Sequence, residues 1–253
     1  MQNQENKNGY DDSMNNYGYS QSASYLDDRM AAELEAADRA TFIVKTYTHL
    51  LGAILAFVGL EVLIFHTLDV ASLTQTFMGG RYSWLIVLVA FMGVSWIADI
   101  WASSTTSVFV QYLGLGVYVL AEAVIFVPLL YIATTYSSPE VLPTAAWTTL
   151  LLFGALSLVV FLTRYDFSFM RSFLFFAGFV ALGLIVVAIL FNFELGPVFT
   201  YAMIAFACCY ILYDTSNVLH HYRVNQHVAA SLALFASVAL LFWYILRLFM
   251  SRE

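Results

Sequence analysis

Seven long apolar segments, separated by short polar breaks, dominate the pattern of this chain. A helix that spans a bilayer needs about 20 consecutive apolar residues. The apolar segments occupy residues 42–65, 84–101, 108–133, 145–163, 172–191, 198–219 and 228–250. None of them shows the alternation of about ten residues that is typical of an outer-membrane barrel strand. The pattern therefore predicts an all-α, polytopic membrane protein with seven transmembrane helices in a single bundle.

The polar breaks contain residues that end or begin helices. Glycines precede the second segment at Gly79-Gly80, and serines and threonines follow it at 103–106. Ser137–Glu140 and Pro143 precede the fourth segment, and Gly196-Pro197 opens the sixth. These breaks predict where each helix ends.

The first forty residues differ from the rest of the chain. Residues 1–24 are rich in Asn, Gln, Ser and Tyr and poor in aliphatic side chains, which predicts disorder. Residues 25–39 contain good helix formers and mixed charge, which predicts a short helix at the membrane surface. We therefore divide the chain into a disordered to partly helical cytoplasmic tail, 1–40, and a transmembrane domain, 41–253.

The composition of the chain supports a transmembrane domain at 41–253 that is surrounded by lipid. The chain is 61% hydrophobic and 11% charged, whereas soluble domains are roughly 45–50% apolar and about 25% charged. Eight of the 17 acidic residues lie in the first forty positions, so the net charge of −7 belongs mainly to the tail. No basic patch suits a nucleic acid. The adjacent Cys208 and Cys209 are expected to be packing residues.

Basic residues predict the topology, because they are more frequent on the cytoplasmic side. A cytoplasmic N-terminus places most of them inside: Lys7, Arg29, Arg39, Lys45, Arg164, Arg171 and Arg223, against Arg81, Arg247 and Arg252 outside. The polar N-terminus does not resemble a signal peptide, so the first span is expected to direct insertion. We expect a multi-pass protein of a bacterial inner (plasma) membrane.

Ionisable residues at membrane depth are the candidates for function. Asp214 lies within the sixth segment, where a charged side chain costs about 2.5–3.5 kcal/mol on insertion scales. Lys45, His49 and Asp99 are predicted at a similar depth toward the cytoplasm, and Glu122 lies deeper in the third segment. Such residues usually handle ions or protons, or form a buried pair.

Structural explanations compete with that interpretation. Lys45 can extend its amine to the headgroups, His49 can be a packing residue, Asp99 can be solvated near the membrane surface, and Glu61 can pair locally. Glu122 and Asp214 are harder to explain in this way. His220, His221 and His227 could sense pH or bind a metal, although a solvated loop explains them more simply.

Four strings of residues together resemble a known family. Lys45-Thr46-Tyr47-Thr48-His49-Leu50 opens the first span, and Glu122 lies in a long third span. Asp166-Phe167-Ser168-Phe169 lies between the fourth and fifth spans, and Tyr213-Asp214-Thr215 closes the sixth. In this order, over about residues 40–250, they resemble a bacterial member of the Bax inhibitor-type family, also called the transmembrane Bax-inhibitor-motif family.

The resemblance implies a seven-helix bundle with the last helix near its centre and a pH-sensitive calcium leak. It also implies that Asp214 pairs with a second aspartate in the last span as a proton-sensing gate, with calcium as an ion that Asp214 binds. One branch of the family instead implies a membrane-bound ATP-dependent protease as partner.

The chain departs from that pattern in the last span. Alignment back from Arg247 puts Ser237 at the position of the second aspartate, and residues 228–250 contain no carboxylate. No basic residue ends the second span, where Asp99 stands. The partner of Asp214 is then Asp99, His49 or Lys45 by depth, or Ser237 as a hydrogen-bond donor.

Two functions are therefore weighed. The first is a pH-modulated passive cation leak, for calcium or protons, with Asp214, Asp99, Glu122, His49, Lys45 and Ser237 as the ion- or proton-sensing residues. The second is a non-conducting protein that binds and regulates a membrane-bound protease or other partner. We expect no enzyme and no cofactor, because the chain has no G-x-S-x-G, H-E-x-x-H or P-loop motif.

Overall fold

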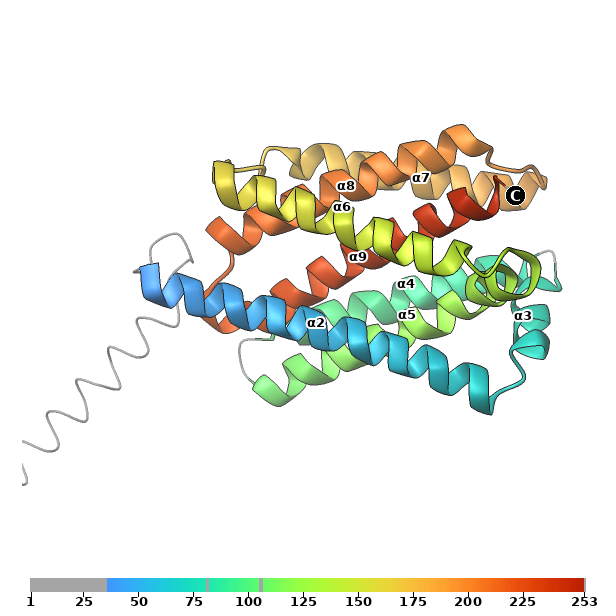
Figure 1. The fold of residues 1–253 in the computed structure, drawn as a ribbon, viewed down its shortest axis with the longest axis horizontal. Helices are drawn as coiled ribbons and strands as arrows, with labels where there is room; N and C mark the ends of the chain where they lie inside the picture. The colour runs from blue at the N-terminus through green and yellow to red at the C-terminus, as the bar shows by residue number, and fades with distance from the viewer. Residues whose placement is uncertain (1–35, 81, 105–106, 253) are drawn as a thin grey trace, which may run out of the picture.

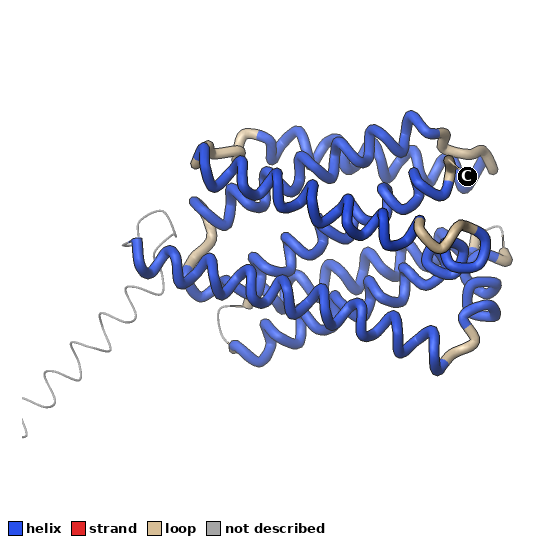
Figure 2. The backbone as a smooth tube through the Cα atoms, viewed as in Figure 1, coloured by secondary structure: helices blue, strands red, loops and turns tan. Residues whose placement is uncertain are grey.

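The computed structural model describes residues 36–80, 82–104 and 107–252, and these residues form helices joined by short loops (Figures 1 and 2). Seven of the described helices are long and apolar enough to cross a membrane, which confirms the predicted fold class. They are α2 (Ala36–Thr67), α4 (Ser83–Ala102), α5 (Val108–Tyr136), α6 (Val141–Thr163), α7 (Met170–Phe191), α8 (Pro197–His220) and α9 (His227–Met250).

A short helix that the sequence reading missed lies between the first two spans. α3 (Val70–Met78) begins where the Asp69 carboxylate accepts a hydrogen bond from the backbone N–H of Ser72, at 3.2 Å. This is the usual cap of a helix N-terminus. α3 packs against α5 and α4. Its nine residues are too few to cross a membrane, so hydropathy gave no signal for it.

Pro143 corrects a predicted boundary. We expected it in the break before the fourth span, but it is the third residue of α6. The first four N–H groups of a helix have no partner within the helix, so a proline there loses no hydrogen bond. The predicted disorder of 1–24 and most of the predicted helix at 25–39 lie outside the described residues, and α2 extends the first span back to Ala36.

α9 is the central helix of the bundle. It packs against α2, α5, α6 and α8 and also contacts α4. In Figure 1, α2, α4 and α5 lie on one side of it and α6, α7 and α8 on the other. α5 and α9 are mostly buried, whereas α2, α4, α6 and α7 expose most of their side chains. This distribution is expected of a bundle whose outer helices face lipid.

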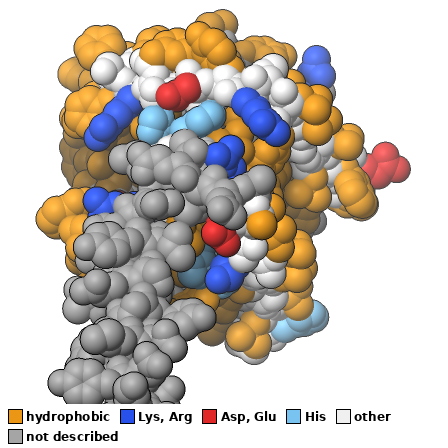
Figure 3. All heavy atoms as spheres, turned by 90° about the vertical axis from the view of Figure 1, so that its left-hand side faces the viewer, with side chains coloured by type: hydrophobic (Ala, Val, Ile, Leu, Met, Phe, Trp, Pro, Cys, Tyr) orange, Lys and Arg blue, Asp and Glu red, His pale blue; other side chains and the backbone are white. Residues whose placement is uncertain are grey.

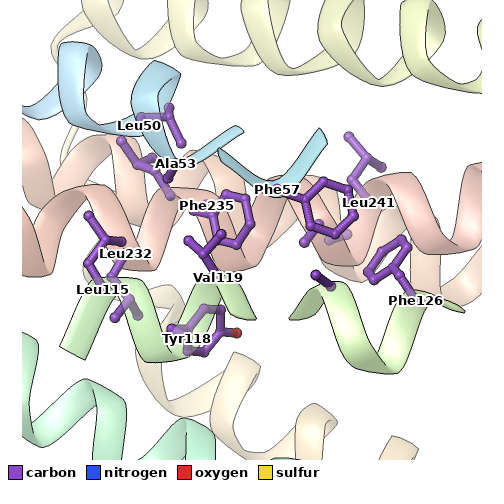
Figure 4. Close-up of a cluster of buried hydrophobic side chains, with 14 of the residues drawn as sticks. Leu50, Ala53, Phe57, Leu115, Tyr118, Val119, Phe126, Leu232, Phe235 and Leu241 are labelled. Carbon is purple, nitrogen blue, oxygen red and sulfur yellow. The ribbon is translucent and has the colours of Figure 1, made fainter. Parts of the chain in front are cut away.

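Aromatic rings fill the contact between α2, α5 and α9 (Figure 4). The Phe57 ring meets the Phe126 ring edge to face, with centroids 5.1 Å apart, and Phe235 of α9 approaches both Phe57 and Tyr118. Packing of this kind matters in lipid, because lipid tails are as apolar as the side chains and burial alone gives little stability. These rings therefore hold α9 against α2 and α5.

α4 and α5 approach each other closely at Gly114. A Cβ atom added there would lie 2.5 Å from both the carbonyl oxygen of Ala98 and the backbone nitrogen of Ala102. Both alanines are fully buried. Small residues allow helix backbones to come together in membranes, so Gly114 sets the spacing of this helix pair.

Candidate functional site

The Asp214 side chain of α8 points at the central helix. Its carboxylate accepts a hydrogen bond from the Ser237 hydroxyl of α9. Both residues are buried, with 6% and 4% of their surface exposed. The sequence left Asp99, His49, Lys45 and Ser237 as candidate partners of Asp214. The structure places Ser237 in direct contact with it.

No basic side chain neutralises the buried acids. Within residues 36–80, 82–104 and 107–252, none of the buried Asp214, Glu122 and Glu61 forms a salt bridge, and neither does the exposed Asp99. Glu61 is 7% exposed, and neither of its carboxyl oxygens has a hydrogen-bond partner among those residues. A buried charge without a partner is costly. These acids must therefore be balanced by protons or by mobile cations.

Tyr222 connects Asp214 to Asp99 electrostatically. It lies in the loop after α8, outside the spanning helices. Burial raises the pKa of its hydroxyl well above the usual value, and the negative charges of Asp214 and Asp99 raise it further. Tyr222 is therefore a neutral phenol within range of both carboxylates. Asp99 itself is exposed on α4, which leaves its carboxylate accessible.

Glu122 has a partner of its own on α5. Tyr118, one helical turn earlier, lies close enough to its carboxyl group for the two side chains to interact. The Tyr118 ring packs edge to face on Phe235 of α9, with centroids 6.1 Å apart. Tyr118 also lies within electrostatic range of Asp99 and Asp214. This buried tyrosine is therefore within electrostatic range of three acids that come from three different helices.

His49 and Lys45 belong to a different cluster. The His49 Nδ1 atom lies 2.7 Å from the Lys45 carbonyl oxygen, and its Nε2 atom lies 2.7 Å from the Tyr112 hydroxyl. The imidazole also meets the His227 ring edge on, at 4.9 Å. These contacts join α2, α5 and α9. The structure therefore brings His49 against Tyr112 and His227 rather than against Asp214, and the Lys45 side chain is exposed.

We call one end of the bundle the basic end, because Lys, Arg and His side chains gather there (Figure 3). Here α6 and α8 finish and α2, α5, α7 and α9 begin, and its residues are Lys45, His49, Arg164, Arg171, His220, His221, Arg223 and His227. One ion pair of this end joins His221 to Asp166, with Nε2 and Oδ2 3.1 Å apart. The Ser216 hydroxyl oxygen accepts a hydrogen bond from the backbone N–H of Phe167, with the nitrogen and oxygen 2.9 Å apart. Both contacts hold the α6–α7 loop against the end of α8.

Asp166→Asn should lower stability slightly at neutral pH. Partial burial acts to raise the pKa of Asp166, but the Ser168 N–H and His221 outweigh it and hold the pKa below its usual value. The contribution of the carboxylate is therefore complete above the unfolded pKa of about 3.9 and disappears as pH falls through the folded value. For so exposed a pair we expect about 1 kcal/mol or less.

The measurement is thermal unfolding in detergent at neutral and acid pH. Glu140→Gln is the control, because Glu140 caps α6 without a side-chain hydrogen bond. A deficit for Asp166→Asn that grows as the pH falls would contradict the role given to this carboxylate.

The described residues offer few side chains that could bind a metal ion together. In the described part of the chain, no three His, Cys, Asp or Glu side chains cluster closely enough to hold a metal ion. Calcium usually takes six to eight oxygen ligands, and Asp214 offers one carboxylate beside the Ser237 hydroxyl. Binding of calcium at Asp214 stays a prediction.

Tyr118, Tyr222 and Tyr112 were missed by sequence reasoning. Tyr118 lies four residues before Glu122, so the spacing that places two side chains on one helix face could have identified it. Tyr112 contacts His49 of another helix, and Tyr222 lies in a loop within electrostatic range of acids on two helices. No local pattern in the sequence marks such contacts.

The fold and these acids define a class: a multi-pass helical membrane protein with buried carboxyl groups around a central helix. Residues 39–253 match the family described as "Inhibitor of apoptosis-promoting Bax1". The chain belongs to this Bax inhibitor family, as its resemblance predicted.

Its relatives include proteins from plants, fungi and bacteria. The chain is 25% identical to Protein LIFEGUARD 4 of Arabidopsis thaliana, over 84% of this chain and 85% of the relative. It is 34% identical to Bax inhibitor 1 of Schizosaccharomyces pombe, over 46% and 44% of the two chains. It is 32% identical to an uncharacterized protein of Pseudomonas aeruginosa, over 44% and 50%. No solved structure matches the chain.

Proposed function

We propose that this protein is a pH-modulated passive pathway for cations, calcium or protons, with Asp214 as the titrating group. The observation that supports this most is the buried contact of Asp214 with Ser237, without a neutralising cation. Protonated Asp214 leaves the contact between α8 and α9 uncharged. Ionised Asp214 needs water or a cation beside it, which requires that contact to open.

The other acids extend the proposed pathway along the bundle. Asp99 is accessible near the end of α4 and attracts cations toward Asp214. Glu122 lies about 21 Å along α5 at roughly 1.5 Å per residue. Glu61 lies in the second half of α2, with both carboxyl oxygens unpartnered among the described residues. Together they provide acidic groups at successive depths, where a cation or proton can pause.

The direct test is ion flux in liposomes that contain only this protein. Calcium- and proton-sensitive dyes would report flux from about pH 6 to about pH 8, the range in which a tuned acid or a histidine changes charge. The proposal expects protein-dependent flux that changes with pH. Flux equal to that of protein-free liposomes at every pH would reject it.

A non-conducting role is the alternative, and one observation favours it. Ser237 stands where a second carboxylate would complete a two-acid gate, and α9 contains no acidic residue. The protein would then bind and regulate a partner, such as a membrane-bound ATP-dependent protease. In either role we propose that it is not an enzyme, which the family assignment and the absence of hydrolase motifs support.

We further propose a bacterial inner-membrane location with the basic end in the cytoplasm, because basic residues are retained there. Reporter fusions after Ser104, Asp166 and Val224 should then be cytoplasmic, and fusions after Gly80 and Glu140 should be exterior. Alkaline phosphatase and a fluorescent protein give opposite signals on the two sides. A cytoplasmic signal after Gly80 would reverse the proposed topology.

A further inference from the structure

A pocket of about 360 Å³ opens at the basic end, beside the last two turns of α8. Every side chain that lines it carries a polar group, and none of these described side chains is acidic. They come from the loop before α7 and its first turn, from the last turns of α8 and the loop after it, and from η2 (Val224–Gln226). They are Ser168, Arg171, Tyr213, Asn217, His221, Tyr222 and Gln226. The lining therefore offers one guanidinium and several neutral hydrogen-bond donors.

Arg171 supplies the charge that the pocket offers. Its side chain is exposed, and the guanidinium has no hydrogen bond or ion pair with any residue that the structure describes. A guanidinium presents paired N–H groups that match the oxygens of a phosphate. The Asn217 and Gln226 amides and the Tyr213 hydroxyl add neutral donors around it. Asp166 lies near the rim rather than in the lining, and its carboxylate is already held by His221 and Ser168.

The surface beside the pocket suits a lipid tail. α7 begins at the pocket and then exposes a row of aromatic side chains, Phe173, Phe175, Phe176 and Phe179. The loop before α7 adds Tyr165, Phe167 and Phe169, whose rings contact one another at 5.1–6.3 Å. Aromatic residues gather at the headgroup level of membranes, and basic pockets between spanning helices bind anionic headgroups.

We propose that this pocket binds a phosphate group, carried by an anionic phospholipid whose acyl chains lie along α7. Arg171 contacts the phosphate oxygens, and Asn217 and Gln226 complete the donor set. None of the acids of the proposed cation pathway lines the pocket, although Tyr222, which is within electrostatic range of Asp214 and Asp99, does. Lipid retention can be measured without ion flux, so the test of this site does not depend on the proposed pathway.

Native mass spectrometry of the purified protein with phosphatidylglycerol tests the lipid source. The wild-type protein should retain phosphatidylglycerol in preference to phosphatidylcholine. Arg171→Gln should weaken retention roughly tenfold, the effect of losing a charge-assisted hydrogen bond. Arg164→Gln is the matched control, because it removes the same charge from the same end outside the pocket.

A second arm tests a soluble source. Inorganic phosphate at constant ionic strength should raise the unfolding temperature of wild type but not of Arg171→Gln if the pocket takes free phosphate. The midpoint of thermal unfolding without ligand shows that each variant is folded. Asn217→Ala is a second variant, which removes a hydrogen-bond donor from the pocket without changing the charge. Equal retention of the two lipids, or an equal loss for Arg171→Gln and Arg164→Gln, together with no effect of inorganic phosphate, would overturn the proposal.

Discussion

Asp214→Asn should remove the pH dependence of ion flux. The amide has nearly the size and shape of the carboxyl group, and its oxygen can still accept the Ser237 hydroxyl hydrogen, so the contact between α8 and α9 is preserved. The amide cannot titrate, however. Flux through Asp214→Asn should therefore be nearly equal at about pH 6 and at about pH 8, whereas flux through the wild-type protein should differ between the two.

Asp69→Asn is the matched control, because it makes the same chemical change at an exposed helix cap where asparagine also caps well. Its flux should follow that of wild type at every pH. An unchanged pH profile for Asp214→Asn would remove Asp214 from the mechanism.

Ser237→Asp extends this experiment. It would place a second carboxylate against Asp214 between the same two helices. Two carboxylates in contact cannot easily both ionise, so they share a proton or bind a divalent cation together. Calcium should therefore act on flux at lower concentration than in wild type, and the pH response should steepen. Equal, pH-independent flux in wild type, Asp214→Asn and Ser237→Asp would reject the proposed site, and no flux in any of them would favour partner binding.

Gly114→Ala should destabilise the bundle by about 1–3 kcal/mol, the usual cost of forcing a group into a packed contact. The new Cβ would lie 2.5 Å from two backbone atoms of α4, which cannot move aside as the end of a flexible side chain can. The helices must therefore separate. Thermal unfolding in detergent, followed by helical circular dichroism, measures the loss.

Gly116→Ala is the control on the same helix. Nothing lies within 4 Å of a Cβ at this position. Alanine is a better helix former than glycine by about 1 kcal/mol, so this variant should be as stable as wild type or slightly more stable. Equal destabilisation of both variants would mean that the approach of α4 to α5 does not limit stability.

The spans could be predicted closely because lipid demands a long run of apolar residues. The segment 84–101 became α4 at Ser83–Ala102, and 198–219 became α8 at Pro197–His220. α3 escaped because its polar cap and its nine residues follow ordinary helix rules rather than hydropathy. Pro143 was misplaced because a proline marks a helix start as readily as a break.

The candidate site could be predicted only in part. Depth along each helix follows from residue counting, and counting made Asp214 a candidate near the end of α8, where the structure has it. Rotation and tilt decide which residues face each other, and neither can be read from one sequence. This is why the contact of Asp214 with Ser237 was one of several alternatives, and why the separation of His49 and Lys45 from Asp214 appeared only in three dimensions.

The central position of α9 has a consequence for biosynthesis. The other six spanning helices precede it in the chain, so they leave the ribosome before the helix around which they pack exists. Until α9 inserts, Asp214 on α8 has no Ser237 hydroxyl beside it, and the aromatic rings of α2 and α5 lack their third partner. Assembly of this bundle is therefore completed only after translation of its final span.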